Sequence, residues 1–447
     1  MDKSNNSKQK INLNHENCNN QQNIKNENES KEENNEIIIE LLISDQDVEK
    51  EIYILCDKNQ IIKDNKQYGY FYKKNNINPP NEFNYFNKNN TKLYLNDKEI
   101  EFNYKLKFNK KGTYKILIKS NINLISLSSM FYNCYKIINI NFIKFNTNNV
   151  IDMSYLFFKC ENLSKLDLSS FNTNNVTKMN EMFSNCENLS ELNLSSFNTK
   201  EVINMCEMFS HCFKLSKLDL SLFNTNNVTN MCWMFYDCEQ LTELNLSSFN
   251  NNKVTNMNEM FSCCKKISEL DLSSLYTNNV IDMSRMFYNC LNLTKLDLSS
   301  FNTNHVTNMS EMFYDCYELS ELDVSSFTTN NVTDMNGMFA YCYKLSKLDL
   351  SSFNTNKVTN MKHMFYDCKK ISELDLSSFN TNNVTDMNGM FSGCKKLSEL
   401  DLSSFNIKNV KKMGNMFEVC RNLNNVGINK LYINKFKDEI ELSEIKF

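Results

Sequence analysis

Apolar residues recur along most of the chain with a fixed period, which is the interval from Cys134 to Cys160 and again from Cys160 to Cys186. Each period contains a Cys with a Phe three positions before it, and the twelve copies run from Cys134 to Cys420 without insertion or deletion. A fixed period of this length is typical of proteins built from stacked structural repeats. One unit cannot bury its own apolar face, so we expect each copy to pack against its neighbours.

Two shorter apolar patterns lie within each copy, as the one around Cys186 shows. The first has spacings of 3, 1, 3 and 3 and consists of Met179, Met182, Phe183, Cys186 and Leu189. This spacing predicts one face of a short α-helix. Leu192 and Leu194 are two positions apart, which predicts one face of a short strand. Phe197 and Val202 complete the apolar set around an Asn- and Thr-rich corner.

The start of the predicted helix carries a capping signal. Asn204 is followed three residues later by Glu207, which is the spacing of a capping box, and Asn256 with Glu259 repeats it. Helices of only two to three turns are not stable alone in water, so we expect stacking of the copies to stabilise them.

The strand region also resembles a known repeat. Leu163–Phe171 reads LSKLDLSSF and resembles the leucine-rich repeat pattern L-x-x-L-x-L-x-x-N. The whole unit, MxxMFxxCxxLxxLDLSSFNTxxVxx, is similar to the repeat of the BspA-like leucine-rich repeat family over about Ile122 to Phe436. The resemblance implies an α/β solenoid of leucine-rich-repeat type with a parallel sheet and short helices. For many relatives it implies a role as a cell-surface adhesin or host-interaction protein.

The resemblance has one departure. Phe171 occupies the place of the buried Asn of the general pattern, which puts the usual Asn ladder in doubt. We expect the neighbouring Asn172, Asn174 and Asn175 to cap the backbone of the turn instead.

The pattern divides the chain into four segments. Residues 1–35 are rich in Asn, Lys, Glu and Gln, and we expect them to be a disordered arm. Residues 36–120 alternate like strands, with turns at Asn96-Asp97 and at Lys110–Gly112, and predict a small β-rich cap or a separate binding domain. Residues 121–420 hold the solenoid. Residues 421–447 contain a decayed last copy, apolar as far as Leu431, and predict a C-terminal cap.

Composition narrows the function and the location. The formal net charge is −4, so no basic field attracts nucleic acid. Only 7 Gly are present, which argues against Gly-rich phosphate loops. No apolar run approaches the ~20 residues of a membrane span, and the N-terminus shows no apolar signal segment. We therefore expect a cytoplasmic protein, with the cell surface as the alternative.

The chain contains 17 Cys, and their spacing bears on the compartment. The twelve repeated Cys lie on the apolar helix face, where a small buried side chain fits. Neighbouring helices pack ~8–10 Å apart, too far for a disulfide, so we expect free thiols and a reducing compartment. Cys206 and Cys232 are one period apart on a more exposed position, and they are the pair we would test for oxidation or metal binding.

Stacked strands would align polar residues in columns ~4.8 Å apart. One column is Asp, with Asn at two early positions, one alternates Lys with Glu, and one is Ser from Ser169 to Ser403. We predict a partner-binding face made of Asp271, Asp297, Asp323, Asp349, Asp375, Asp401, Lys295, Glu321, Lys347 and Glu373.

Six Asp on consecutive rungs repel one another, by ~1 kcal/mol per pair in bulk water and more where water is partly excluded. Local relief would come from Lys295, Lys347, the Ser hydroxyls and water. The alternative is a basic partner or Ca²⁺, although Asp and Ser supply only part of the ~6–8 oxygens that Ca²⁺ takes.

Catalysis has little support in the sequence. His15, His211, His305 and His363 share no repeat position, and no catalytic motif such as HExxH is present. Trp233 lies on the polar side of its predicted helix, as a packed or a surface contact residue. We predict a non-enzymatic protein–protein interaction scaffold without cofactor or metal, whose partner carries a basic patch.

Overall fold

The structure is a computed structural model that describes residues 35–57, 60–61, 86–432 and 434–435. All of them lie in the compact unit Glu33–Phe447. The predicted disordered arm therefore lies outside the described residues except for Asn35. That residue is buried, and its side chain donates to the Ile122 carbonyl at 2.8 Å, so the expectation of disorder does not hold for Asn35 itself.

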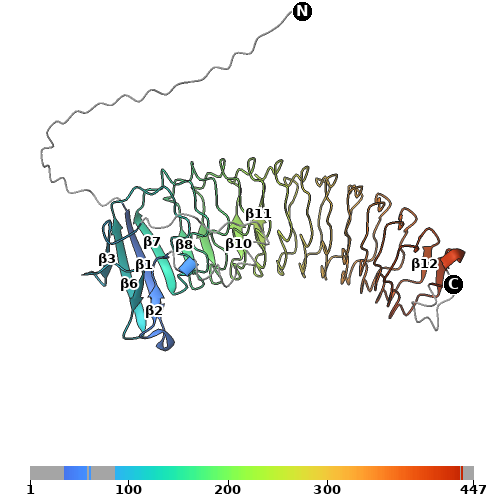
Figure 1. Cartoon of the computed structure of the whole chain (residues 1–447), viewed down its shortest axis with the longest axis horizontal. Coiled ribbons are helices and arrows are strands. Elements are labelled where there is room, and N and C mark those ends of the chain that lie inside the picture. Colours follow the sequence, from blue (N-terminus) through green and yellow to red (C-terminus); the bar gives the residue numbers. More distant parts are fainter. Residues whose placement is uncertain (1–34, 58–59, 62–85, 433, 436–447) are drawn as a thin grey trace, which may run out of the picture. The chain divides into compact units, whose positions relative to one another are not determined.

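A five-stranded antiparallel sheet begins the described chain, in the order β4-β3-β6-β1-β7 (Figure 1). Its strands are β1 (Asn35–Ile43), β3 (Thr91–Leu95), β4 (Lys98–Ile100), β6 (Gly112–Ser120) and β7 (Ile137–Lys144). A second pair joins β2 (Glu51–Tyr53) to β5 (Lys105–Lys107), and a 3-10 turn, η1 (Asp45–Asp47), lies between β1 and β2.

Alternation in the sequence explains this sheet. Ile37, Ile39 and Leu41 are fully buried, while the residues between them are partly exposed. The predicted turn at Asn96-Asp97 joins β3 to β4, and both residues have positive φ as a tight hairpin turn requires. Strand β7 belongs to the first repeat and pairs with β1. This pairing is what a cap would make, and the capping role stays a prediction.

The repeats form coils, and some of the coils contribute a short strand to one face, which we call the strand face. The strands are β8 (Lys165–Asp167), β9 (Glu191–Asn193), β10 (Lys217–Asp219), β11 (Glu243–Asn245), β12 (Glu399–Leu402) and β13 (Asn425–Ile428). They pair in parallel as β8–β9, β10–β11 and β12–β13, as predicted. The sheet is not continuous, however, because residues 246–398 contain no strand.

The predicted helices are wrong. In residues 121–420 the MxxMFxxC segments form successive turns instead of α-helix. In one coil the N–H groups of Glu181, Phe183 and Asn185 donate to carbonyls of the next coil at 2.8–3.0 Å, whereas Cys186 N–H donates three residues back to the Phe183 carbonyl. The apolar residues spaced by 3, 1, 3 and 3 therefore lie on tight turns that are hydrogen-bonded from coil to coil.

Left-handed residues prevent a helix in these turn segments. Glu181 has a φ of 54° and Asn185 a φ of 61°, and the equivalent residues of most coils are also positive. Gly337 and Gly389 occupy the first of these positions with φ of 58° and 60°. The capping box is also wrong, because the Asn204 side chain accepts from the N–H of Cys206 at 3.0 Å, and Glu207 is buried.

Coil-to-coil pairing runs without interruption along the turn segments. Parallel bridges join Ser126 to Asp152, Asp152 to Lys178, and so on in steps of one period to Lys412. The continuous ladder of the array therefore lies beside the turns and not on the predicted strand face.

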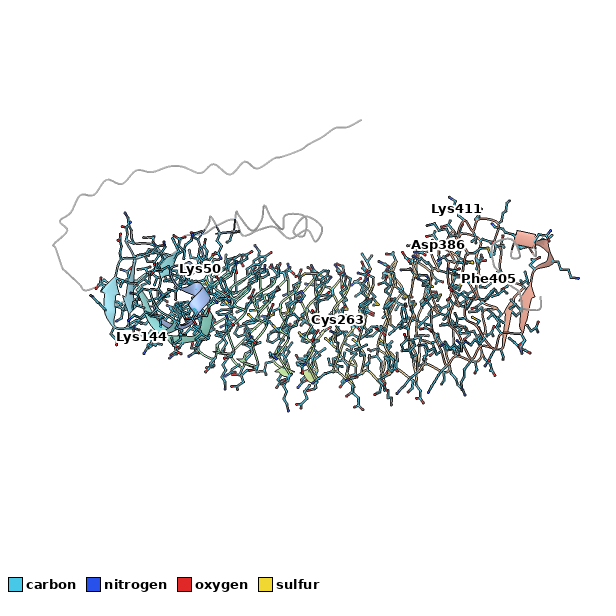
Figure 2. The ribbon with its side chains drawn as sticks, turned by 90° about the horizontal axis from the view of Figure 1, so that it is seen from below. Lys50, Lys144, Cys263, Asp386, Phe405 and Lys411 are labelled. Atoms are coloured by element: carbon cyan, nitrogen blue, oxygen red, sulfur yellow. A yellow bond between two sulfur atoms is a disulfide. The ribbon has the colours of Figure 1, made fainter. Side chains whose placement is uncertain are left out.

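The core is a set of identical side chains stacked on one another, and Figure 2 shows side chains along all of the coils. The Phe three positions before each repeated Cys is buried in all twelve copies, from Phe131 to Phe417. Neighbouring rings lie 5.5–5.8 Å apart between centroids and are nearly parallel. Each of the apolar positions predicted around Cys186 is buried except Leu192, which is partly exposed.

The repeated thiols are buried, as predicted, and they have hydrogen-bond partners. From Cys160 to Cys420, each of the repeated Cys donates its S–H to the carbonyl of a Phe 29 residues earlier, at 3.0–3.3 Å. Burial raises the pKa of these thiols, for example of Cys160 and Cys238, which keeps the donating proton in place.

A buried Thr replaces the Asn ladder of the general leucine-rich repeat. The Thr329 hydroxyl donates to the Asn354 carbonyl at 2.9 Å and accepts from the Asn354 N–H at 2.8 Å. Thr173 makes the same pair of bonds to Asn198. The neighbouring Asn172 caps its own turn through Asn174 N–H at 3.0 Å, as expected, but the buried Thr was not predicted from the sequence.

The last coil ends in β13 and a 3-10 turn, η2 (Lys430–Tyr432). Val426 is fully buried on this coil, but Leu431 is 83% exposed. The prediction that apolar packing persists as far as Leu431 is therefore wrong, because the regular coil ends before it.

We expect the substitution Thr329→Val to destabilise the array. It keeps the shape but leaves the buried N–H and C=O of Asn354 without a partner, which costs about 1–3 kcal/mol for each group. Urea denaturation followed by circular dichroism would measure the change. The control is Thr333→Val, whose hydroxyl makes one bond, 3.1 Å to the Thr307 carbonyl, at an exposed position. Equal stability of the two variants would contradict a structural role for the Thr ladder.

Candidate functional site

All ten residues predicted for the partner-binding face are exposed on the strand face. Each Asp lies between two buried Leu or Val residues of its coil, so its carboxylate projects away from the core. The structure thus brings these side chains onto one surface. Their role in binding stays a prediction.

Each Asp of this face is held by its own coil. An Oδ1 atom accepts from the N–H of the Ser two residues later, at 2.8–3.0 Å, in all six coils from Asp271 to Asp401. The backbone N–H of Ser299, and then its hydroxyl, lower the pKa of Asp297. Hydrogen bonds from the following Ser likewise lower the pKa of Asp271, Asp323, Asp349 and Asp375. The local explanation through Ser is therefore supported, and the carboxylates stay ionised at neutral pH.

The paired rungs of the strand face share one feature. Each paired rung sets an Asp against a residue that is not acidic at that position: Asp167 faces Asn193, Asp219 faces Asn245, and Asp401 faces Gly427. Asn193 donates to Asp167 at 3.1 Å. No rung on which Asp follows Asp is paired. Like charges placed directly opposite one another destabilise strand pairing. The rungs Asn193–Asp219 and Asn245–Asp271 carry no Asp pair and are also unpaired, so charge explains only part of the gap in the sheet.

Lysine relieves this charge less than expected. Lys165 pairs with Glu191 and Lys217 with Glu243, both at 2.5 Å, on the rungs that form strands. Lys295 and Lys347 make no ion pair among the described residues. The charge of Lys295 still helps to lower the pKa of Asp297, after the hydrogen bonds from Ser299, so the expected relief by lysine is partial at that position. The described residues also contain no group of three His, Cys, Asp or Glu side chains that could hold a metal ion.

The three described His residues are spread over different parts of the coils. His211 and His363 lie on turn segments, where the His211 Nδ1 is 3.2 Å from Asp237 Oδ2, and His305 lies at the Asn-rich corner. His15 lies outside the described residues. Trp233 is half-buried and stacks on Tyr236 with ring centroids 4.9 Å apart. The structure brings no His beside the Asp column.

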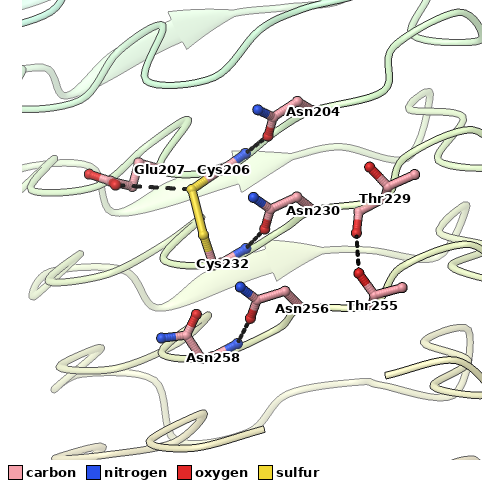
Figure 3. Close-up of a disulfide and its surroundings, with 9 residues drawn as sticks. All are labelled: Asn204, Cys206, Glu207, Thr229, Asn230, Cys232, Thr255, Asn256 and Asn258. Atoms are coloured by element: carbon pink, nitrogen blue, oxygen red, sulfur yellow. Dashed lines mark hydrogen bonds between the residues drawn. A yellow bond between two sulfur atoms is a disulfide. The ribbon is translucent and has the colours of Figure 1, made fainter. Parts of the chain in front are cut away.

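Cys206 and Cys232 form a disulfide between neighbouring coils (Figure 3). Their Cα atoms are 4.9 Å apart, because the turn segments are hydrogen-bonded to each other. This is the pair that the sequence singled out as a candidate for oxidation, although both residues are buried and not on a more exposed position as expected. Within the described chain it is the disulfide-bonded pair, and the repeated Cys are free.

Buried carboxyl groups stack beside this disulfide. Glu181 is fully buried, and Glu207 is 3% exposed one coil further on. Burial, and then the charge of Glu259, raise the pKa of Glu207 to about 8. Burial, and then the charge of Glu207, raise the pKa of Glu181 as well. Sequence reasoning missed this, because the capping-box pattern placed Glu207 at an exposed helix start.

The coils and their parallel pairing define a repeat solenoid of leucine-rich type, in which the described coils of residues 121–420 contain no α-helix. A family model described as "Mycoplasma protein of unknown function, DUF285" matches residues 125–242, 212–321, 291–379 and 343–439, which together exceed half of the chain. The chain belongs to this family. No curated protein matches it.

Three solved structures show a distant likeness to the chain. A leucine rich cell surface protein from Faecalibacterium prausnitzii is 16% identical, with a TM-score of 0.36, over 67% of this chain and 81% of that one. The TLR13–ssRNA13 complex is 17% identical, with a TM-score of 0.23, over 66% of this chain and 52% of that one. The functional domain of InlJ from Listeria monocytogenes is described as including a cysteine ladder. It is 16% identical, with a TM-score of 0.14, over 63% of this chain and 62% of that one. These likenesses are too weak to indicate a function.

We expect Asp323→Asn to stabilise the array. Asp323 has an Asp on each neighbouring rung, and an Asn there would remove two repulsions and could donate to Asp297 as Asn193 does to Asp167. The melting temperature should rise by about 1–2 °C at low salt, and the gain should shrink as salt increases. Asp167→Asn is the control, because it faces Asn193 and should give no gain. A lower melting temperature for Asp323→Asn would contradict the charge explanation.

We also expect stability to fall as the pH rises from 5 to 8. Protonated Glu207 is favoured in the folded protein, so its contribution is complete below its ordinary pKa of about 4.5 and is lost as the pH rises toward 8. The slope for one such group is about 1.4 kcal/mol per pH unit. Glu207→Gln should flatten the dependence in urea denaturation at several pH values, whereas the exposed Glu373→Gln should not. An unchanged slope in Glu207→Gln would show that this carboxyl is not the titrating group.

Proposed function

We propose that the protein is a non-enzymatic binding protein whose strand face engages a partner protein that carries a basic patch. The observation behind this proposal is the column of six exposed Asp on consecutive coils, from Asp271 to Asp401. Their carboxylates are ionised and are fixed by backbone N–H groups, so the face has a defined pattern of negative charge.

A fixed carboxylate loses little conformational freedom when a partner binds, which favours affinity. The column also costs stability in the unbound protein, because the rungs that carry Asp beside Asp do not pair. Lys or Arg side chains of a partner would relieve this repulsion, and they would speed association at low salt. The hollow lined by Asn139, Lys165, Asp167 and Glu191 lies on the same face and would extend the contact toward the first coils.

A location at the cell surface is the second part of the proposal. The disulfide between Cys206 and Cys232 is of a kind that persists in oxidising environments, and it outweighs the free buried thiols that favoured the cytoplasm. The BspA-like resemblance also implies surface adhesion or host interaction. Among the described residues no helix is long and apolar enough to span a membrane. Labelling of intact cells with a membrane-impermeant reagent would test the location, and protection of the protein in intact but not lysed cells would contradict it.

The binding role is tested by a variant with Asn at Asp297, Asp323, Asp349 and Asp375. Asn keeps the hydrogen bond from Ser and removes four charges, so the fold should persist while capture of a basic partner weakens at least tenfold. The measurement is binding of partners captured by the full chain, repeated at rising salt. A matched control replaces Glu239, Glu318, Asp152 and Asp386 by their amides, which removes four charges away from the strand face. Equal binding by both variants would make the strand-face proposal wrong.

A further inference from the structure

Aromatic residues gather on the outer side of the turn segments, which we call the turn face. The Tyr residues of 121–420 that lie on turn segments or directly after their Cys are Tyr132, Tyr135, Tyr155, Tyr236, Tyr288, Tyr314, Tyr317, Tyr341, Tyr343 and Tyr366. Tyr276, at the corner, is the exception. The Asp column carries no aromatic residue, so the two faces differ in chemistry. Tyr is also enriched where binding energy concentrates in protein interfaces.

The turn face already holds cations between rings and carboxylates. Lys369 Nζ lies 3.5 Å from the centroid of the Tyr343 ring and 3.3 Å from Asp367 Oδ2. Arg285 is 5.7 Å from the Tyr288 ring centroid, and its Nε is 2.8 Å from Glu311 Oε2. In both cases an aromatic ring and a carboxylate from nearby coils bind one positive charge, which is the combination expected for cation–π recognition.

Asp315 has the same surroundings but no cation. It is half-buried, it lies two residues before Tyr317, and its backbone N–H donates to the carbonyl of Ala340, the residue before Tyr341, at 2.8 Å. No described residue makes an ion pair or a side-chain hydrogen bond with its carboxylate. Burial raises the pKa of Asp315. Burial and Asp367, and then the charge of Asp315, raise the pKa of Tyr343 to about 12.

The rings around Asp315 stand at right angles. The Tyr317 and Tyr343 centroids are 4.9 Å apart with an interplanar angle of 85°, and the Tyr341 and Tyr343 centroids are 5.9 Å apart at 88°. Tyr317 is 41% exposed, so the group is open to solvent. Perpendicular rings present a face and an edge to one volume, and the faces carry the negative end of the ring quadrupole.

We propose that Asp315, Tyr317, Tyr341 and Tyr343 form a binding site for the ammonium group of a lysine side chain on a partner protein. The occupant follows from charge complementarity. A carboxylate that is partly removed from water and has no counter-ion is stabilised by a positive charge, and the three rings favour an alkylammonium over a hydrated metal ion. Lys369 already lies over the Tyr343 ring, 3.5 Å from its centroid, and shows a lysine ammonium in this chemistry, so a partner's lysine would bind on the side of Tyr317 and Tyr341. The site is separate from the Asp column and does not depend on its role.

The test is a binding titration of the full chain with a short fluorescent peptide rich in lysine, read by anisotropy. A second peptide has norleucine in place of each lysine and keeps the alkyl stem without the charge. The wild type should bind the lysine peptide at least tenfold more tightly than the norleucine peptide. Asp315→Asn should reduce binding of the lysine peptide about tenfold, and Tyr317→Leu about threefold. The exposed Tyr276→Leu is the matched control and should bind as the wild type does.

Two comparisons make the result decisive. In the strand-face variant with four Asn, adding Asp315→Asn should still weaken binding of the lysine peptide about tenfold, because the two surfaces are separate. If Asp315→Asn caused no loss of affinity in that variant, the proposed site would be wrong. Melting curves should show Asp315→Asn at least as stable as the wild type, since it removes a half-buried charge without a partner. Equal affinity of the wild type and Asp315→Asn would make the proposal wrong. Tighter competition by tetramethylammonium than by N-acetyl-lysine amide would also overturn it, in favour of a quaternary ammonium ligand.

Discussion

The whole structure depends on one constraint, which is that a single coil of the array cannot bury its apolar side chains alone. The Phe ring three positions before each repeated Cys packs on the equivalent ring of the next coil, and the buried Thr of the corner bonds to the backbone of the next coil. The thiols donate backward in the same way. Because these contacts join equivalent positions, an insertion of one residue would break all of them at once, and the unchanged period from Cys134 to Cys420 reflects this.

Stacking equivalent positions has an opposite effect on the surface. Stacking one coil on the next stabilises the fold where Phe packs on Phe. The same stacking destabilises it where Asp lies beside Asp, because like charges repel. The coils tolerate this because the turn segments carry an uninterrupted ladder of backbone bonds, so the strand face can lack pairing without loss of the array. The Asp column is thus a charged surface on coils that are held together by the backbone ladder of the turn segments. Its charge and this support together make it a candidate for binding a basic partner.

The turn face follows a different principle. Its left-handed positions hold Glu, Trp, Arg, His or Gly in different coils, so the coils are least alike there. Neighbouring coils consequently form unlike pairs, including the Cys206–Cys232 disulfide and the Lys369–Asp367 ion pair. Local chemistry can arise on this face at one place in the array, whereas any chemistry on the strand face is repeated along it.

The sequence by itself determined the period, the identity of the buried apolar residues, the parallel direction of the strands that form and the placement of the Asp column, because burial and register follow directly from spacing. It did not determine the backbone of the MxxMFxxC segment, since spacings of 3 and 4 suit both a helix and a series of tight turns. Only the tertiary structure decided this, through N–H groups that bond to the next coil instead of within their own. The buried Glu207, the close approach of Cys206 to Cys232 and the ring cluster at Asp315 all follow from those turns, because contacts between residues one period apart depend on how closely two coils approach.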